Sequence, residues 1–477
     1  MNILKCMREP RLSMRRFACV VVVSVFLVTG CAGFPVGDSK VQTPKNVVII
    51  FADGVAATQW DFGRWSSAVL RQKPFVTADF FRYQTIGLLA NSPHGAYITD
   101  SAAAASAMAT GYKVANAVLS VTPDGKSPQT VMEAAKAKGK RIGLISTSTV
   151  YDASPAAFSI HSKSRRDSQA LVDKILALSP DVLLGGGADY FLPEKAPGGK
   201  RKDGKDIVAQ FRAKGWQIAT NTAELKAATE ARLLGLFADE DMAFDIERDP
   251  VKEPTMAEMT AAALKALSQA NPNGFVLFVE SENTDTAGHA NDAASLMHSL
   301  WAIDDAVKVA LDYQRGSPDT LVIVAGDHET GGLSATYAQK DLSSMSSSNR
   351  FYTGDAQLRM LGGITMSFKT AAGKLGKKPS GDALDALVAK HFPGFKLDPD
   401  LREMILTQKT LERNHTYAVQ NILGRMVARQ TGFYWGTGGH TGEPVLVGTA
   451  GPGADLFRGY QDNTDFGKNL HRLIEAR

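Results

Sequence analysis

Three short stretches of the sequence place carboxylates and histidines at spacings that suit a divalent cation. In ESENTDTAGH, Asp285 and His289 are four residues apart, so a helical turn would put both on one face. Asp327 and His328 are adjacent in GDHETGG, and His440 lies in the glycine-rich run GTGGHTGE. Any one of these histidines could be an ordinary surface or core residue. Together they offer the carboxylate oxygens and imidazole nitrogens that bind Zn²⁺.

A serine that precedes a run of alanines could supply a nucleophile beside such a cation. In TDSAAAASAMATGYK, Asp100 and Ser101 stand directly before four alanines, a pattern typical of a helix N-cap followed by strong helix formers. The same position would aim the Ser101 hydroxyl out of a helix start, where N–H groups and the helix dipole attract an anion. This stretch allows both interpretations, and they are compatible.

The chain contains five short apolar runs, and two of them lead directly into the stretches that hold Asp285 and Asp327. The runs are NVVIIFA (46–52), RIGLIST (141–147), DVLLGG (181–186), GFVLFVE (274–280) and TLVIVAG (320–326). Such runs are typical of strands buried on both faces, and helical patterns lie between them at 127–139, 167–179 and 254–270. We therefore expect an α/β fold, a three-layer sandwich with a mostly parallel central sheet and helices on both faces. Ligands of such sheets bind at the carboxyl ends of the strands.

The first thirty residues have the charge layout of an export signal, with five basic residues before the apolar run FACVVVVSVFLVTG. The end of this run, LVTGC, resembles a bacterial lipobox, which implies cleavage before Cys31 and lipidation of its thiol. An ordinary export signal with an incidental cysteine is the alternative. We therefore predict a signal peptide at 1–30, a tether at 31–44, and a lipid-anchored protein that faces the periplasm or the cell surface.

Removal of this leader changes what the charge and the cysteines imply. The leader holds five basic residues and one acidic residue, which together account for the formal net charge of +4. A neutral mature chain offers no electrostatic basis for nucleic-acid binding. Cys6 and Cys19 leave with the leader, so Cys31 has no intrachain partner.

The motifs after the leader occur in the order found in alkaline phosphatases. They are an aspartate after the first strand, DSAAAASA, DASPAA followed by an arginine, VE-x4-D-x3-H, GDH and GGHTGE. The stretches 183–193 and 235–250 also resemble the animal and related bacterial branch of that family. The resemblance implies one catalytic domain over 45–475, with an insertion over roughly 335–432, near the active site, that breaks the α/β alternation.

The resemblance also implies the site residues. It assigns one zinc ion to Asp285, His289 and His440. It assigns a second zinc ion to Asp53, Asp327 and His328, with Ser101 as its ligand on the substrate side. It assigns one magnesium ion to Asp53, Ser154 and Glu280. Arg165, rather than its neighbour Arg166, aligns with the arginine that binds phosphate oxygens. The implied reaction is hydrolysis of phosphate monoesters through a phosphoserine on Ser101.

Two positions depart from the enteric type of the family. Ser154 stands where that type has threonine, and Thr286 stands where it has lysine and many relatives have histidine. A phosphodiesterase or pyrophosphatase on the same scaffold, or a non-catalytic binding lipoprotein, is the alternative function. The chain could form a homodimer, and the insertion could cover the site or join subunits.

Overall fold

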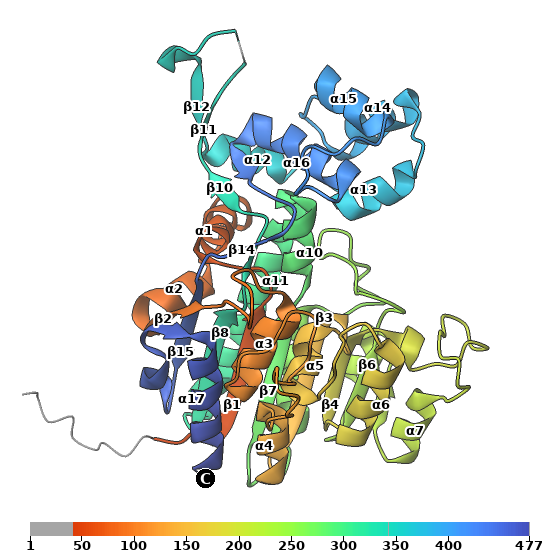
Figure 1. Ribbon diagram of the computed structural model, residues 1–477, viewed down its shortest axis with the longest axis vertical. Coiled ribbons are helices and arrows are strands. Elements are labelled where there is room, and N and C mark those ends of the chain that lie inside the picture. The colour runs from red at the N-terminus through yellow and green to blue at the C-terminus, as the bar shows by residue number, and fades with distance from the viewer. Residues whose placement is uncertain (1–41, 342, 477) are drawn as a thin grey trace, which may run out of the picture. The chain divides into compact units, whose positions relative to one another are not determined.

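The computed structural model describes residues 42–341 and 343–476, which belong to one compact unit (Figure 1). The predicted signal peptide, Cys31 and nearly all of the predicted tether lie outside the described residues. Within the described part of the chain, no helix combines the length and the apolar character that crossing a membrane requires.

A ten-stranded sheet runs through the unit. From edge to edge its strands are β16 (Gly459–Asp462), β2 (Thr85–Ala90), β15 (Val445–Ala450), β8 (Thr320–Gly326), β1 (Asn46–Ala52), β7 (Phe275–Ser281), β3 (Arg141–Thr149), β4 (Val182–Gly186), β6 (Leu233–Leu236) and β5 (Gln217–Ala219). Only β15 runs antiparallel to its neighbours, and every other pair in this sheet is parallel. The predicted mostly parallel α/β sheet is therefore confirmed.

The central strands form because their aliphatic side chains can all be buried. β1, β7 and β8 are buried along their whole length, as expected for strands covered by helices on both faces. Figure 1 shows α3, α4, α5 and α17 on one side of the sheet and α11 on the other. α9 packs against α11 and against strands β3 and β7. These helices are α3 (Ser101–Thr110), α4 (Val131–Ala137), α5 (Ala153–Ser159), α9 (Met256–Ser268), α11 (Ala293–Gly316) and α17 (Asn463–Glu475).

The three predicted helical patterns each contain a helix, with shifted bounds. The pattern at 127–139 yields only α4, because Thr130 forms a capping box with Glu133 and so starts the helix late. The pattern at 167–179 yields α6 (Ser168–Leu178) and the one at 254–270 yields α9. The remaining helices of the sheet region are α1 (Ala57–Ser66), α2 (Val76–Tyr83), α7 (Ile207–Ala213), α8 (Thr222–Lys226) and α10 (Asn283–Ala290).

The described part of residues 335–432 contains a short hairpin followed by five α-helices. The hairpin pairs β11 (Tyr337–Gln339) with β12 (Arg350–Tyr352). The helices are α12 (Asp355–Leu361), α13 (Phe368–Leu375), α14 (Gly381–His391), α15 (Pro399–Leu406) and α16 (Ala418–Thr431).

Two short antiparallel pairs join the two ends of this segment. β10 (Leu333–Ala335) pairs with β13 (Phe433–Trp435), and β9 (Glu329–Thr330) pairs with β14 (His440–Thr441). The register places His440 opposite Thr330. The pairing therefore brings GGHTGE beside GDHETGG, although about a hundred residues separate them in the sequence.

Candidate metal centre

The register of the parallel strands gathers the first group of predicted ligands. Phe51 of β1 pairs with Glu280 of β7, and Ala52 pairs with Gly326 of β8. Asp53 and Asp327 follow directly, so three carboxylates meet at the carboxyl ends of adjacent strands. Gly54 allows the close approach, because a Cβ at this residue would lie 2.8 Å from the Cα of Asp285.

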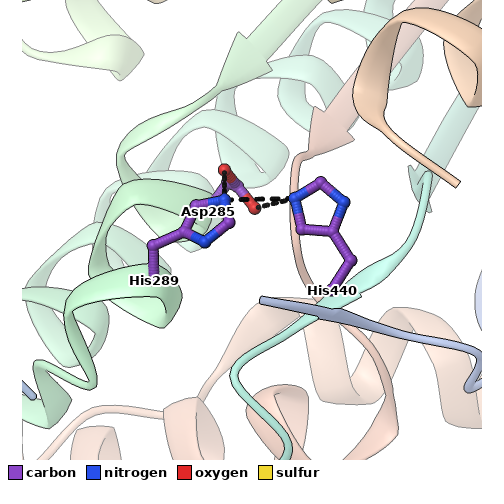
Figure 2. Close-up of side chains that lie close together, drawn as sticks. All are labelled: Asp285, His289 and His440. Atoms are coloured by element: carbon purple, nitrogen blue, oxygen red, sulfur yellow. Dashed lines mark hydrogen bonds and ion pairs between the residues drawn. The ribbon is translucent and has the colours of Figure 1, made fainter. Parts of the chain in front are cut away.

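Asp285, His289 and His440 form one compact ligand group (Figure 2). His289 Nε2 lies 3.2 Å from Asp285 Oδ2, and His440 Nε2 lies 3.5 Å from Asp285 Oδ1. The two histidine Nε2 atoms are only 3.1 Å apart. This geometry brings two imidazole nitrogens and one carboxylate to a single point, as a bound cation requires.

Backbone carbonyls fix the orientation of both imidazoles. His289 Nδ1 donates to Gly438 O and His440 Nδ1 donates to Thr99 O, each over 2.7 Å. With Nδ1 protonated, each Nε2 is the nitrogen available to a metal ion. Burial alone would lower the pKa of His289, but Asp285 outweighs it and raises the pKa to about 9. A cation would take the place of that proton.

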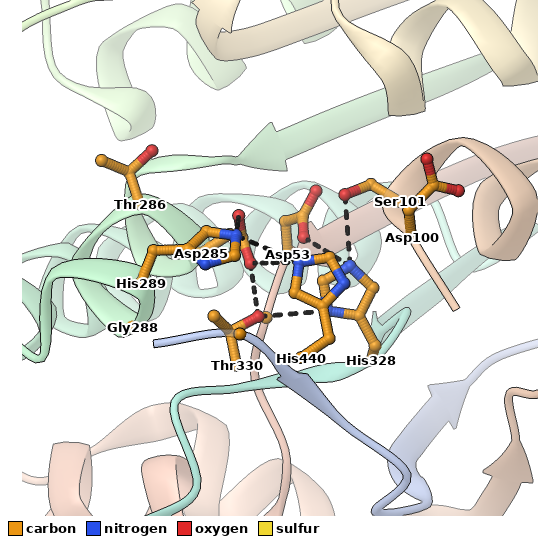
Figure 3. A network of polar contacts seen from close by, with 12 residues as sticks. Asp53, Asp100, Ser101, Asp285, Thr286, Gly288, His289, His328, Thr330 and His440 are labelled. Atoms are coloured by element: carbon orange, nitrogen blue, oxygen red, sulfur yellow. Dashed lines mark hydrogen bonds and ion pairs between the residues drawn. The ribbon is translucent and has the colours of Figure 1, made fainter. Parts of the chain in front are cut away.

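A second group forms around His328, which is fully buried (Figure 3). Its Nε2 lies 3.2 Å from Asp327 Oδ2 and 3.4 Å from Asp53 Oδ1. Asp285 also offers an oxygen that lies within 4.8 Å of ligand atoms of Asp53 and His328, so this carboxylate lies between the two groups rather than in one alone. Burial and His440 hold the pKa of His328 well below its usual range, which keeps the imidazole in the neutral form that binds metals.

Thr330 connects the two groups, and sequence reasoning missed it. Its hydroxyl donates to Asp285 Oδ1 and lies 3.2 Å from His328 Nδ1, from which it can accept. The hydroxyl therefore orients a ligand of each group at once. A threonine next to GDH carries no signal of this role, because Asp285, to which it donates, lies 45 positions earlier in the sequence.

A third, oxygen-only group lies on the other side of Asp53. Ser154 Oγ donates to Asp53 Oδ2 over 3.3 Å, and Glu280 Oε2 accepts from Ser146 Oγ over 2.5 Å. Glu280 is fully buried. Ser146 is a second residue that the sequence did not single out, since it lies inside a strand and belongs to no motif.

Three buried carboxylate oxygens in this cluster have no hydrogen-bond partner among the described residues. They are Asp53 Oδ1, Glu280 Oε1 and Asp327 Oδ2. Burial, and secondarily the other carboxylates, raise the pKa of Asp53 well above its usual range, that of Glu280 to about 8 and that of Asp327 to about 7. Uncompensated negative charge in a buried site costs several kcal/mol per group, so this donor set fits divalent cations.

Ser101 lies at the edge of this cluster, at the first residue of α3. Its Oγ is 3.2 Å from His328 Nε2, and the residue is 4% exposed. Asp100 caps the helix, because its Oδ1 accepts from Ala103 N over 2.9 Å. The structure therefore confirms Asp100 as the N-cap, and it places the Ser101 hydroxyl against the candidate ligand His328.

Arg165, but not Arg166, contacts the residue before Ser101. Arg165 Nη1 is 3.4 Å from Asp100 Oδ2, and its Nη2 is 3.2 Å from Asp152 Oδ1. The side chain of Arg165 is 26% exposed, whereas Arg166 is exposed to solvent. Thr286 donates to Glu282 Oε1 over 2.7 Å, and Figure 3 shows its side chain pointing away from the ligand cluster.

The sequence profile of the alkaline phosphatase family matches residues 44–476. Alkaline phosphatase 3 of Bacillus subtilis is 29% identical over 440 residues, which cover 90% of this chain and 89% of that protein. The alkaline phosphatase of Escherichia coli is 31% identical over 356 residues, which cover 63% of this chain and 74% of that protein.

Solved structures give the same result. Thermus thermophilus alkaline phosphatase superposes with a TM-score of 0.82 at 27% identity, covering 91% of this chain and 92% of that one. The cold-active enzyme of a Shewanella species superposes with a TM-score of 0.73 at 30% identity, covering 90% and 99%. The profile match spans nearly all described residues and includes every candidate ligand. The chain belongs to the alkaline phosphatase family, whose members are metal-dependent enzymes that act on phosphate monoesters.

Proposed function

We propose that the chain hydrolyses phosphate monoesters through a phosphoserine intermediate on Ser101, with two zinc ions and one magnesium ion. The observation that carries this proposal is the position of the Ser101 hydroxyl. It lies at a helix N-terminus, 3.2 Å from His328 Nε2, beside buried carboxylate oxygens that have no hydrogen-bond partner among the described residues.

The donor chemistry supports one assignment of the ions. The two groups that contain imidazoles suit zinc, and the group of oxygens alone suits magnesium. Zinc would be held by Asp285, His289 and His440, and by Asp53, Asp327 and His328. Magnesium would be held by Asp53, Ser154 and Glu280. When bound, these ions would neutralise the charge that develops on the phosphoryl oxygens and stabilise the deprotonated serine.

The chain's own residues set up both steps of the reaction. The N-terminus of α3 offers N–H groups to the phosphate, and Arg165 can donate two parallel hydrogen bonds to its terminal oxygens. In the first step the Ser101 oxygen bonds to phosphorus and the alcohol leaves. In the second step water attacks the phosphorus of the phosphoserine. Inorganic phosphate is released and the Ser101 hydroxyl is regenerated.

The same residues favour monoesters over diesters. Arg165 contacts Asp100, the residue before Ser101, where it would bind a terminal dianion, and the second ester group of a diester would occupy one of those oxygens. We expect fast release of nitrophenol from p-nitrophenyl phosphate and slow release from bis(p-nitrophenyl) phosphate. The reverse ratio would favour the phosphodiesterase alternative.

The covalent step is tested by Ser101→Ala in the metal-loaded enzyme. We expect kcat to fall by several orders of magnitude while inorganic phosphate still binds, as measured by competition or calorimetry. Ser106→Ala is the matched control, because Ser106 is a buried serine of the same helix whose hydroxyl contacts the backbone of Val118 and Ser120. Near-normal turnover in Ser101→Ala would contradict the phosphoserine route.

We further propose that the chain is exported, that Cys31 is lipidated, and that the mature protein forms a homodimer. The support is the LVTGC sequence after an apolar run. Mass analysis of the mature N-terminus decides the lipidation: a diacylated Cys31 is expected, and a free thiol or a different cleavage site would contradict it. Sedimentation of the mature protein gives the number of subunits.

A further inference from the structure

A buried asparagine from the 335–432 segment contacts the helix that carries two of the candidate zinc ligands. Asn421 lies in the first turn of α16 and is fully buried. Its Nδ2 donates to the backbone carbonyl of His289 over 2.8 Å and to Asn291 Oδ1 over 2.9 Å. Its Oδ1 accepts from Tyr417 N over 3.0 Å. All three contacts of the side chain are thus to groups at or beside α10 and α16.

The carbonyl of His289 needs such a donor. It belongs to the last turn of α10, where carbonyl oxygens have no partner within the helix. α10 ends at Ala290, and its C-cap residue Asn291 has a left-handed backbone with φ of 55°. Asn291 Nδ2 donates to Gly288 O over 3.0 Å and to Thr437 O over 2.7 Å, so it ties the end of α10 to the loop before His440.

A second contact from the same segment reaches that loop. The carbonyl of Asn414 accepts from Gly438 N over 2.8 Å and from Thr437 Oγ1 over 3.2 Å. Gly438 O is the acceptor for His289 Nδ1. The packing is close, because a Cβ on Gly438 would lie 3.2 Å from Asn421 Oδ1 and 3.3 Å from the carbonyl oxygens of Asn414 and His289.

We propose that Asn421 is a positioning residue for the cation held by Asp285, His289 and His440. Through Asn421 and Asn414, the 335–432 segment fixes both the end of α10 and the loop that precedes His440. It therefore sets the affinity of this one zinc site. By thermodynamic reciprocity, zinc at this site stabilises the packing of α16 on α10. The inference rests on the proposed function only for the assignment of zinc to this group.

The test is a zinc titration of the full-length, metal-free protein against a chromophoric chelator. In Asn421→Ala we expect one zinc equivalent to weaken by roughly 10- to 100-fold, the range typical of outer-shell partners of metal ligands, while the other is unchanged. Asn271→Ala is the matched control. Asn271 also bridges backbone carbonyls, those of Leu267 and Gly274 at 2.8 Å each, but at the end of α9. It should lower thermal stability and leave both zinc affinities as in the wild type.

Hydrogen exchange of the wild-type protein keeps the proposal decidable if Asn421→Ala does not fold. We expect zinc to slow exchange of the backbone amides at 414–425. Unchanged zinc affinities in Asn421→Ala, or exchange at 414–425 that does not respond to zinc, would overturn the proposal. Normal monoester hydrolysis with unaltered zinc binding in Asn421→Ala refutes only this inference. If zinc binding weakens in Asn421→Ala as expected but the wild-type protein does not hydrolyse monoesters, only the proposed function is refuted. A wild-type protein that binds no zinc refutes both.

Discussion

The ligand cluster has two halves that the fold builds in different ways. In the first half, Asp53, Glu280 and Asp327 follow or end parallel strands, and the register of the sheet alone brings them together. In the second half, His289 and His440 come from a helix end and a glycine-rich loop. Hydrogen bonds between distant segments orient both rings and hold the end of the helix.

The two halves also differ in how deeply their side chains are buried and in the direction of their carboxylate pKa shifts. The side chains of Asp53 and Asp327 are 3% and 0% exposed, whereas those of His289 and His440 are 22% and 13% exposed. The first half collects buried carboxylates with raised pKa values. In the second half, the imidazoles outweigh burial and hold the pKa of Asp285 well below its usual range. We infer that the sheet half needs cations for electrostatic compensation, and that the loop half needs them mainly for geometry.

Removal of all divalent cations should produce the largest effect, because it leaves the sheet half uncompensated. We expect chelation to abolish phosphatase activity and to lower the melting temperature by on the order of 10 °C. Calorimetry before and after chelation, with separate return of Zn²⁺ and Mg²⁺, measures both. A melting curve that is unchanged after verified metal loss would remove the electrostatic distinction between the halves.

Substitution of one ligand from each half should change the stability of the metal-free protein in opposite directions. Asp327→Asn keeps the acceptor for Gly54 N and removes a buried charge, so we expect the metal-free protein to gain roughly 1–3 kcal/mol at pH 8. His440→Asn removes a group that stabilises the Asp285 carboxylate and should lose about 1 kcal/mol. Urea unfolding of both metal-free variants gives the sign. Changes of equal sign would show that the two halves are electrostatically alike.

The pH dependence of the metal-free protein sharpens the same point. The folded-state pKa values of Glu280 and Asp327, about 8 and about 7, are raised above those of an unfolded chain. The folded state therefore binds more protons than the unfolded state, and its stability falls as pH rises from about 4 to about 8. Glu280→Gln should flatten this decline, and bound metal should remove most of it. A metal-free protein that becomes more stable between these pH values would contradict the assignment.

An effect confined to phosphate binding is expected outside both halves, at Arg165. Loss of a charge-assisted pair of hydrogen bonds costs about 1.5–3 kcal/mol, so Arg165→Ala should weaken phosphate binding by roughly 10- to 150-fold without changing the zinc content. Arg166→Ala, one residue away and exposed, is the control and should behave as the wild type. Inhibition by inorganic phosphate and metal analysis measure the two quantities. A loss of zinc in Arg165→Ala would show that this residue supports one of the zinc sites.

The sheet half was predictable from sequence because its causes are local. The runs at 46–52, 274–280 and 320–326 are mostly apolar, and the residues that end or follow them must lie at one edge of a parallel sheet. The spacing of Asp285 and His289 also predicted a shared helix face, and both lie on α10. The bounds 1–30, 31–44 and 335–432 and the roles of the individual ligands stay predictions.

The loop half and its supports were not predictable in the same way. Asn421 binds the carbonyl of a residue 132 positions away, and Thr330 donates to Asp285, 45 positions away. Neither interaction leaves a local pattern of residue types. The sequence analysis also missed β2 and β15. The outer sheet positions of these strands depend on pairing between residues more than three hundred and fifty apart.

The central claim is that the clustered oxygen and nitrogen donors hold divalent cations beside Ser101. Anomalous diffraction at the zinc absorption edge, from crystals of the metal-loaded protein, tests it most directly. The account predicts one peak among Asp285, His289 and His440 and a second beside Asp53, His328 and the Ser101 hydroxyl. Peaks elsewhere, or the absence of any peak within bonding distance of these side chains, would contradict it.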